Sequence, residues 1–178
     1  LAPPLLRRDP GARAICLNVR AEPYLATLLA GPNSATDLRG HGPERMRRLL
    51  RRLGPDALSA LHTLSHGELA AMSWLAETLT QRDVSEMSPD RVLAVDFDAL
   101  LADVPGGMSR IASHLQVQAP AGWADHVATS PALTRYSKSP EHEYSPALRA
   151  QVLDQARREH AGELQRGLAW LEGVARAE

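Results

Sequence analysis

Two short apolar segments, residues 12–19 (ARAICLNV) and residues 91–97 (RVLAVDF), constrain what this chain can fold into. Each is bounded by turn residues, which is typical of a buried β-strand. Helical patterns separate them, so we expect the strands to pair in parallel through helical crossovers. Two strands do not make a stable parallel sheet, because parallel sheets are normally covered on both faces. The chain is therefore either the C-terminal portion of a larger α/β protein or a mostly helical domain with a small two-stranded element.

Three segments between the first strand and residue 117 predict helices. Residues 43–54 (PERMRRLLRRLG) place apolar side chains on one face and end at Gly54. Residues 65–79 begin with a capping box, in which Ser65 precedes Glu68 by three positions. Residues 106–117 (GGMSRIASHLQV) show the same apolar spacing. We expect all three helices to pack an apolar face against the core.

The last part of the sequence predicts a loop followed by one long helix. Residues 130–146 (SPALTRYSKSPEHEYSP) contain too many serines and prolines for either periodic element. Ser145 then caps a helix in which Pro146 takes the first position. The apolar stripe of this helix continues to Val174, and its glycines are expected to bend it.

Length and charge bound the class of protein. A chain of 178 residues that is 44% hydrophobic fits a single domain with one core. The net charge of −1 provides no field that would recruit nucleic acid or an anionic membrane.

Cys16 is the single cysteine, which excludes an internal disulfide and favours a reducing compartment. No signal-peptide core or membrane span is visible, so we expect a cytoplasmic protein without a membrane partner.

Arg20 is the first candidate for a binding residue. It follows the first strand and precedes a helix start, and ligands of open α/β sheets bind at such strand ends. Backbone N–H groups and the helix dipole point there, and an arginine can hold a phosphate with two hydrogen bonds. The alternative is an arginine at the sheet edge that pairs with Glu22.

The late loop supplies a second group of candidates. Residues 135–142 bring together two cations, two hydroxyls and an imidazole, carried by Arg135, Tyr136, Ser137, Lys138 and His142. Binding groups concentrate in loops on a rigid scaffold. A solvated surface loop is an equally good interpretation.

Other clusters favour structural interpretations. The arginines of residues 43–54 most simply form a solvated face, although such a face can also bind phosphates or a membrane surface. His62 and His66 have no third metal ligand at a suitable spacing, so no metal site is predicted. Asp98 is expected to cap the helix after the second strand. Nucleophile-elbow, Walker A and dinucleotide-binding motifs are absent from the sequence.

With these residues in view, the chain resembles the C-terminal two thirds of a sulfotransferase that uses 3′-phosphoadenosine 5′-phosphosulfate (PAPS). The segment PGARAICLNVRAEP resembles the first strand and turn of that family, and GELAAMSWL resembles its tryptophan helix. The segment PDRVLAVDFDALLADVPGGMSRIASHLQV is the most specific match, with its strand, acidic pair, Leu-Leu and following helix. The resemblance implies a P-loop-like three-layer α/β fold, of which this chain is a helix-rich portion with about two parallel strands.

The resemblance also implies a binding site for the nucleotide. Arg20 would hold the 3′-phosphate, and a hydroxyl about two turns into the next helix would assist. Leu28 occupies the expected serine position, so Thr27 is the nearest hydroxyl. Arg135, Tyr136 and Lys138 would cover the adenosine end. The implied partners are PAPS and a small-molecule acceptor with a hydroxyl or amine, without a metal, and a homodimer stays open.

The resemblance places the catalytic groups upstream of Leu1. The family's phosphosulfate loop and its general base precede the first strand, so the single domain is expected to be incomplete at its N-terminus. Positioning and charge stabilisation supply most of the catalysis of such transfers, so we expect this chain to be inactive alone. The alternatives are a non-catalytic helical protein-interaction module, which uses the arginine face and the terminal helix, and a relative of the nucleoside or sugar kinases.

Overall fold

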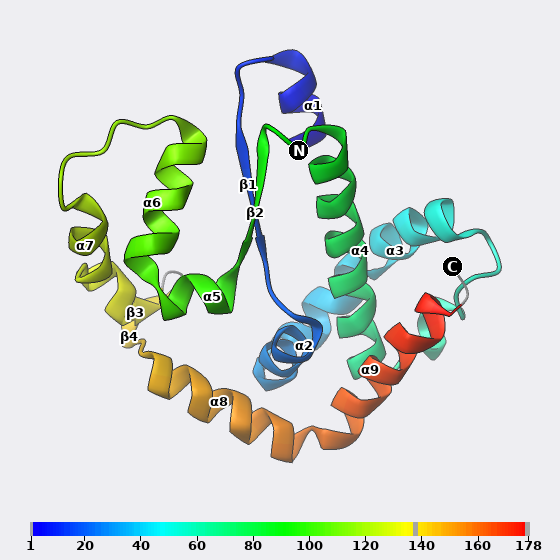
Figure 1. The fold of residues 1–178 in the computed structure, drawn as a ribbon. Helices are drawn as coiled ribbons and strands as arrows, with labels where there is room; N and C mark the ends of the chain where they lie inside the picture. The colour runs from blue at the N-terminus through cyan, green and yellow to red at the C-terminus, as the bar shows by residue number, and fades with distance from the viewer. Residues whose placement is uncertain (1, 137–138, 177–178) are drawn as a thin grey trace. The chain divides into compact units, whose positions relative to one another are not determined.

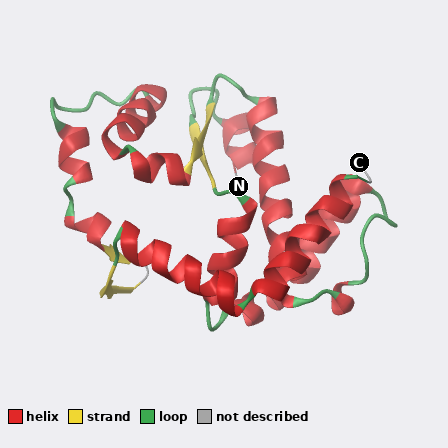
Figure 2. Cartoon of the chain, turned by 60° about the horizontal axis from the view of Figure 1, so that its bottom comes forward, coloured by secondary structure: helices red, strands yellow, loops and turns green. Residues whose placement is uncertain are grey.

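The structure is a computed structural model that describes residues 2–136 and 139–176. Helices dominate it, and its strands are few and short (Figure 2). Contacts divide the chain into two compact units. The first unit comprises Leu1–Val19 and Gln81–Arg149, and the second comprises Arg20–Thr80 and Ala150–Glu178. The chain is thus a helix-rich α/β protein.

The first unit contains the predicted parallel strands, β1 (Ala14–Asn18) and β2 (Val92–Asp96), which lie side by side in Figure 1. Ala14 is opposite Val92, and the register continues without a shift to Asn18 opposite Asp96. Both strands therefore end at the same edge of the sheet. The other elements of this unit are α1 (Ala2–Arg8), α5 (Phe97–Ala102), α6 (Val104–Leu115), α7 (Trp123–Ala128), the 3₁₀-helix η2 (Pro131–Thr134), β3 (Arg135–Tyr136) and β4 (Ser139–Glu143).

Helix α1 was not expected from the sequence, because prolines disfavour helices in general. Here the prolines occupy the first turn, where no backbone N–H is needed for an intrahelical bond. Leu6 of this helix packs with Cys16 and Val92 in a small core. The Arg91 Nη1 donates to the carbonyl oxygen of Leu6 at 2.8 Å and also reaches the next carbonyls of the turn. One guanidinium thus binds one carbonyl of the last turn of the helix and two carbonyls of the loop that follows it.

The second unit is entirely helical. It contains α2 (Ala21–Ala30), α3 (Ser34–Leu53), the 3₁₀-helix η1 (Leu61–Thr63) and α9 (Ala161–Ala175), together with parts of α4 (His66–Met87) and α8 (Pro146–Glu159). Its core is built on residues of α2, α3, α4 and α9, of which Leu25, Leu49 and Met72 are almost fully buried. The predicted capping box is confirmed, because the Ser65 N–H donates to the Glu68 carboxylate at 2.7 Å and the Glu68 N–H donates to the Ser65 hydroxyl at 3.3 Å.

Three helix predictions were wrong in their extent. Helix α4 continues to Met87, beyond the predicted residue 79. Helix α3 begins at Ser34 and passes through Pro43, where the sequence suggested its start. The predicted long terminal helix is two helices, because His160 leaves helical geometry with φ −116° and ψ 24°. Leu148 and Val152, expected in the buried stripe, are 38% and 39% exposed. Ser145 caps α8 as predicted, through its hydroxyl and the Leu148 N–H.

Candidate functional site

Arg20 occupies the junction between β1 and α2, as the sequence predicted. It is the N-cap residue of α2, with extended backbone angles of φ −60° and ψ 150°. Its carbonyl oxygen accepts the first intrahelical hydrogen bond, from the Tyr24 N–H at 3.2 Å. The side chain is exposed and makes no capping bond to the helix. Arg20 therefore places a guanidinium at a helix N-terminus, where the helix dipole favours an anion.

One face of α2 collects the polar groups next to this arginine. Arg20, Tyr24 and Thr27 are spaced four and three residues apart, so they follow one another along the helix. The Tyr24 hydroxyl lies 3.0 Å from the hydroxyl of Ser73, a fully buried residue of α4. Our sequence analysis missed Tyr24 and Ser73, although the spacing of Tyr24 from Arg20 could have revealed the first of them. The hydroxyl pair fixes this face of α2 against α4.

The Thr27 hydroxyl is exposed but already has a partner. Its Oγ1 donates to the carbonyl oxygen of Pro23 at 2.7 Å, one turn earlier in the helix. A hydroxyl has one proton, so Thr27 can donate to a phosphate only by giving up this bond. Exchanging the Pro23 carbonyl for a phosphate oxygen strengthens the hydrogen bond, because a charged acceptor makes a stronger hydrogen bond than a carbonyl does.

Glu22, the carboxylate two residues after Arg20, is neutralised by an arginine that is distant in sequence. Arg157 of α8 donates through Nε and Nη2 to the two oxygens of this carboxylate, at 2.7 and 2.9 Å. This hydrogen bonding is the main reason that the pKa of Glu22 lies below its ordinary value of 4.5, and the charges of Arg157 and Arg20 act in the same direction. Asp154 holds the Nη1 of Arg157 at 2.7 Å. The negative charge next to Arg20 is therefore already compensated.

The ion pair predicts how stability depends on pH. The folded state lowers the pKa of Glu22, so the pair stabilises the fold above pH 4.5, and this contribution is lost as the pH falls below that value. We expect Glu22→Gln to unfold at lower urea concentration than the unchanged protein at pH 7, and the difference to shrink on acidification. Glu44→Gln is the control, because the pair of Glu44 with Arg47 is exposed and contributes little. A difference that is constant between pH 7 and about 3 would contradict this role of Glu22.

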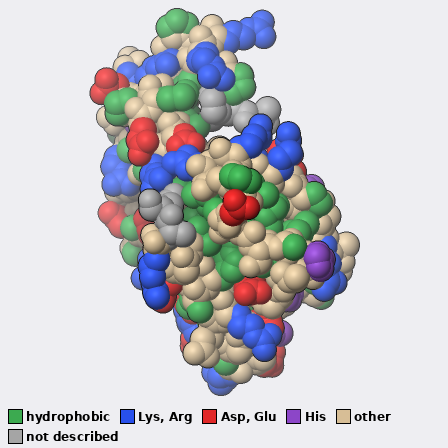
Figure 3. All heavy atoms as spheres, turned by 90° about the vertical axis from the view of Figure 1, so that its right-hand side faces the viewer, with side chains coloured by type: hydrophobic (Ala, Val, Ile, Leu, Met, Phe, Trp, Pro, Cys, Tyr) green, Lys and Arg blue, Asp and Glu red, His purple; other side chains and the backbone are tan. Residues whose placement is uncertain are grey.

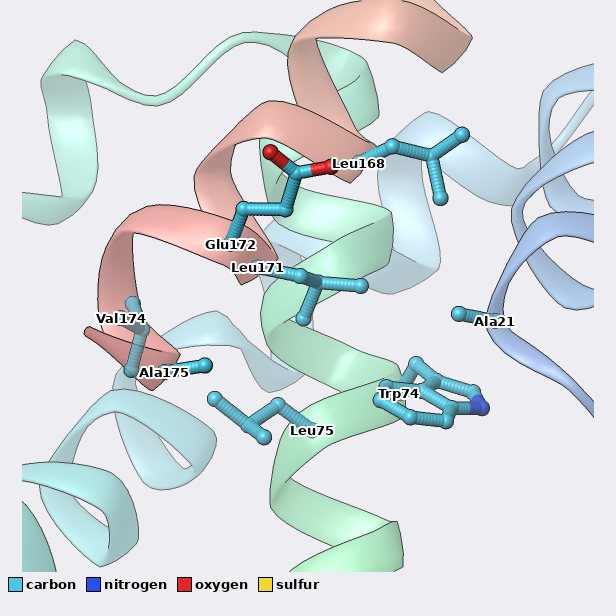
Figure 4. Close-up of a pocket in the computed structure, with 8 residues that line it drawn as sticks. All are labelled: Ala21, Trp74, Leu75, Leu168, Leu171, Glu172, Val174 and Ala175. Carbon is cyan, nitrogen blue, oxygen red and sulfur yellow. The ribbon is translucent and has the colours of Figure 1, made fainter. Parts of the chain in front are cut away.

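An apolar groove begins immediately after Arg20. It has a volume of about 420 Å³, and the close-up shows the Trp74 indole, Leu168 and Leu171 around it, with Ala21 on one side (Figure 4). The Glu172 carboxylate is the acidic group of its lining. Ligand sites of small molecules have this size and a mostly apolar wall. On the face shown in Figure 3, hydrophobic side chains also gather in a patch with charged side chains around it.

The late loop has more structure than the sequence suggested. Arg135–Tyr136 and Ser139–Glu143 pair as an antiparallel hairpin, with Arg135 opposite Glu143 and an irregularity in the register. Arg135 is exposed. Ser137 and Lys138 lie outside the described residues. The hairpin belongs to the first unit, whereas Arg20 and Thr27 belong to the second, so an approach of Arg135, Tyr136 and Lys138 to the nucleotide stays a prediction.

Two further groups have structural partners. Asp96, and not Asp98, caps the helix after β2, because its carboxylate accepts from the Ala99 N–H at 2.8 Å. Asp98 instead pairs with Arg149 at 2.8 Å. The His66 Nε2 lies 3.2 Å from the Ser34 hydroxyl. In residues 2–136 and 139–176, no cluster of three or more His, Cys, Asp or Glu side chains is arranged to hold a metal ion.

Comparisons of the chain with family models, curated proteins and solved structures find no match. In the part of the chain that the structure describes, no helix is both long and apolar enough to cross a membrane.

Proposed function

We propose that this chain is the nucleotide-binding portion of a PAPS-dependent sulfotransferase with a three-layer α/β fold. The observation that carries the proposal is the position of Arg20. It follows a parallel strand by two residues and is the N-cap of a ten-residue helix, and Arg157 neutralises the nearby carboxylate of Glu22. A strand end that leads into a helix N-terminus is where open α/β sheets bind phosphorylated ligands.

In this proposal each residue of α2 has a defined task. Arg20 binds the 3′-phosphate of the nucleotide through its guanidinium, which matches the geometry of a phosphate. Thr27 donates a second hydrogen bond after releasing the carbonyl oxygen of Pro23. Tyr24, held by Ser73, keeps the face of α2 in place. The sulfuryl group that PAPS supplies would be handled by residues upstream of Leu1, which would complete this single domain of a cytoplasmic protein.

The groove beside Ala21 is suited to the acceptor. Its wall is apolar, so it would select a molecule with a hydrophobic body and leave a hydroxyl or amine free to receive the sulfuryl group. The carboxylate of Glu172 at the groove would favour an acceptor that carries an amine. The hairpin residues Arg135 and Tyr136, with Lys138, complete the proposed set as a cover for the adenosine end.

Nucleotide affinity tests the assignment of Arg20. We expect 3′-phosphoadenosine 5′-phosphate to bind the chain roughly 10 to 100 times more tightly than adenosine 5′-monophosphate, the effect of one charged hydrogen-bonding contact. Arg20→Ala should remove this difference, and Arg20→Lys should restore part of it through charge alone. Isothermal titration calorimetry measures both affinities. Arg39→Ala, an exposed arginine of α3, is the control that should keep the preference. Equal affinity of the unchanged chain for the two nucleotides would refute the proposal.

The alternative, a helical protein-interaction module, is favoured by a separate observation. An open groove with an arginine rim runs along α3. The two candidate functions use different surfaces of the second unit.

A further inference from the structure

The C-terminal half of α3 carries a groove of about 470 Å³ that nucleotide binding does not use. Its lining consists of Pro43, Met46, Arg47, Leu50, Arg51 and Pro55. The apolar members from the helix are three and four residues apart, so they form a row along one face. Met46 is the buried member of this row, at 8% exposed. The two arginines are four residues apart and run parallel to the apolar row.

Arg48 and the two arginines that line the groove, Arg47 and Arg51, differ in what they contact. Arg48 is committed to the packing of α3 on α4, because it reaches Glu77 at 2.5 Å and the Thr80 hydroxyl at 3.3 Å. The groove arginines are exposed. Arg47 pairs with Glu44, one turn earlier, at 2.6 Å. Arg51 makes no hydrogen bond or ion pair with any residue in 2–136 or 139–176. The groove therefore presents more positive than negative charge beside an apolar row.

We propose that this groove binds an acidic amphipathic helix of a partner protein. Apolar side chains of that helix would fill the space above Met46 and Leu50, and a carboxylate on its flank would meet Arg51. Amphipathic helices bind grooves in this way, with anchors at helical spacing. A second carboxylate could replace Glu44 on Arg47 at little cost, because an exposed ion pair contributes little to stability. This inference does not depend on sulfuryl transfer.

The lining of the groove favours a helix over an anionic membrane. An amphipathic helix that lies on a bilayer presents a broad apolar face, which sinks into the headgroup region. Here Met46 is buried and Leu50 is half-buried, whereas the arginines beside them are exposed. The groove therefore offers a bilayer no broad apolar face.

Peptide binding to the full chain tests the proposal. The probe is a fluorescein-labelled amphipathic peptide of leucine and glutamate, compared with the same peptide carrying lysine for glutamate and with a scrambled leucine–glutamate peptide. Fluorescence anisotropy measures binding.

We expect only the leucine–glutamate peptide to bind. Arg51→Glu should weaken the affinity for this peptide about tenfold, because an attraction becomes a repulsion. Arg39→Glu makes the same charge change on α3 away from the groove and should leave affinity unchanged. Binding should also weaken at high salt.

Several results would overturn the proposal. Equal binding of the lysine peptide or of the scrambled peptide would show that neither charge nor amphipathic pattern matters. Equal loss in Arg39→Glu would show a general charge effect. Binding to phosphatidylserine vesicles without binding to the peptide would replace the partner helix by a membrane surface. If Arg51→Glu does not fold, Arg51→Gln replaces it, with an expected loss of about threefold, and an unchanged affinity in that variant would count against the proposal.

Discussion

Gly67→Ala is expected to destabilise the protein by about 3 kcal/mol, because helices α4 and α9 meet at this residue without room for a methyl group. A Cβ on Gly67 would overlap the backbone carbonyl of Glu163. The same crossing excludes a Cβ on Gly167, which would lie 2.5 Å from the carbonyl oxygen of Gly67 and 2.6 Å from the Leu25 Cδ2. Backbone atoms cannot rotate away as a side chain can, so the helices would have to separate. Urea unfolding followed by circular dichroism measures the loss.

The chain supplies matched controls for this prediction. Gly162 is the second residue of α9, as Gly67 is the second residue of α4, and a Cβ on Gly162 has no atom within 4 Å. Gly173 is a second open position in α9. Alanine at either should leave stability unchanged or raise it by up to about 1 kcal/mol, since glycine is the poorer helix former. If Gly67→Ala behaved like Gly162→Ala, the close approach of α4 and α9 would be wrong.

Glu163 shows why these helices meet at glycine. Its carboxylate accepts a hydrogen bond from the Gly67 N–H at 2.7 Å. This bond places a negative charge at the N-terminus of α4, where the helix dipole favours it. That bond is the main reason that the pKa of Glu163 is lowered from 4.5. The carboxylate can reach the first turn of α4 only where the two backbones come close. A glycine at each side permits this approach.

Local sequence signals predicted those parts of the fold that depend on neighbouring residues. The parallel strands follow from short apolar segments separated by helices, and their ends were placed within two residues. The capping box at Ser65 and the hydroxyl cap at Ser145 are decided within one helical turn. Arg20 at the start of α2 was placed correctly for the same reason.

Features of the fold that depend on contacts between residues far apart in the sequence could not be predicted from local patterns. Arg157 lies 135 residues from Glu22 in sequence, and no local pattern connects them. The break at His160 has no proline, and it lies three residues before the glutamate that caps α4. The pairing of β3 with β4 depends on cross-strand contacts, which the serines and prolines of this stretch concealed. The local sequence predicted the position of Arg20, and the fold supplied the neutralisation of Glu22 beside it.

Leu25 connects the helix crossing with the candidate site. It is fully buried, and it extends from α2, which carries Arg20, to Gly167 of α9. We expect Leu25→Ala to cost about 3 kcal/mol, the usual range for removing a buried leucine, through lost burial and a residual cavity. Circular dichroism in urea again measures the change.

Combining Leu25→Ala with Gly167→Ala turns this contact into a double-mutant cycle. Removing the Leu25 side chain also removes the Cδ2 that a methyl group on Gly167 would meet, so the double variant should be at least about 1 kcal/mol more stable than the sum of the single changes predicts. Compensation should be incomplete, because the carbonyl oxygen of Gly67 still lies 2.5 Å from the new methyl group. Leu25→Ala with Gly173→Ala is the matched cycle and should be additive, since Gly173 faces open space. Additivity in both cycles would show that the Leu25 side chain does not contact α9 next to Gly167. Packing of α2 against α9 at this point would then not be what holds Arg20 in place.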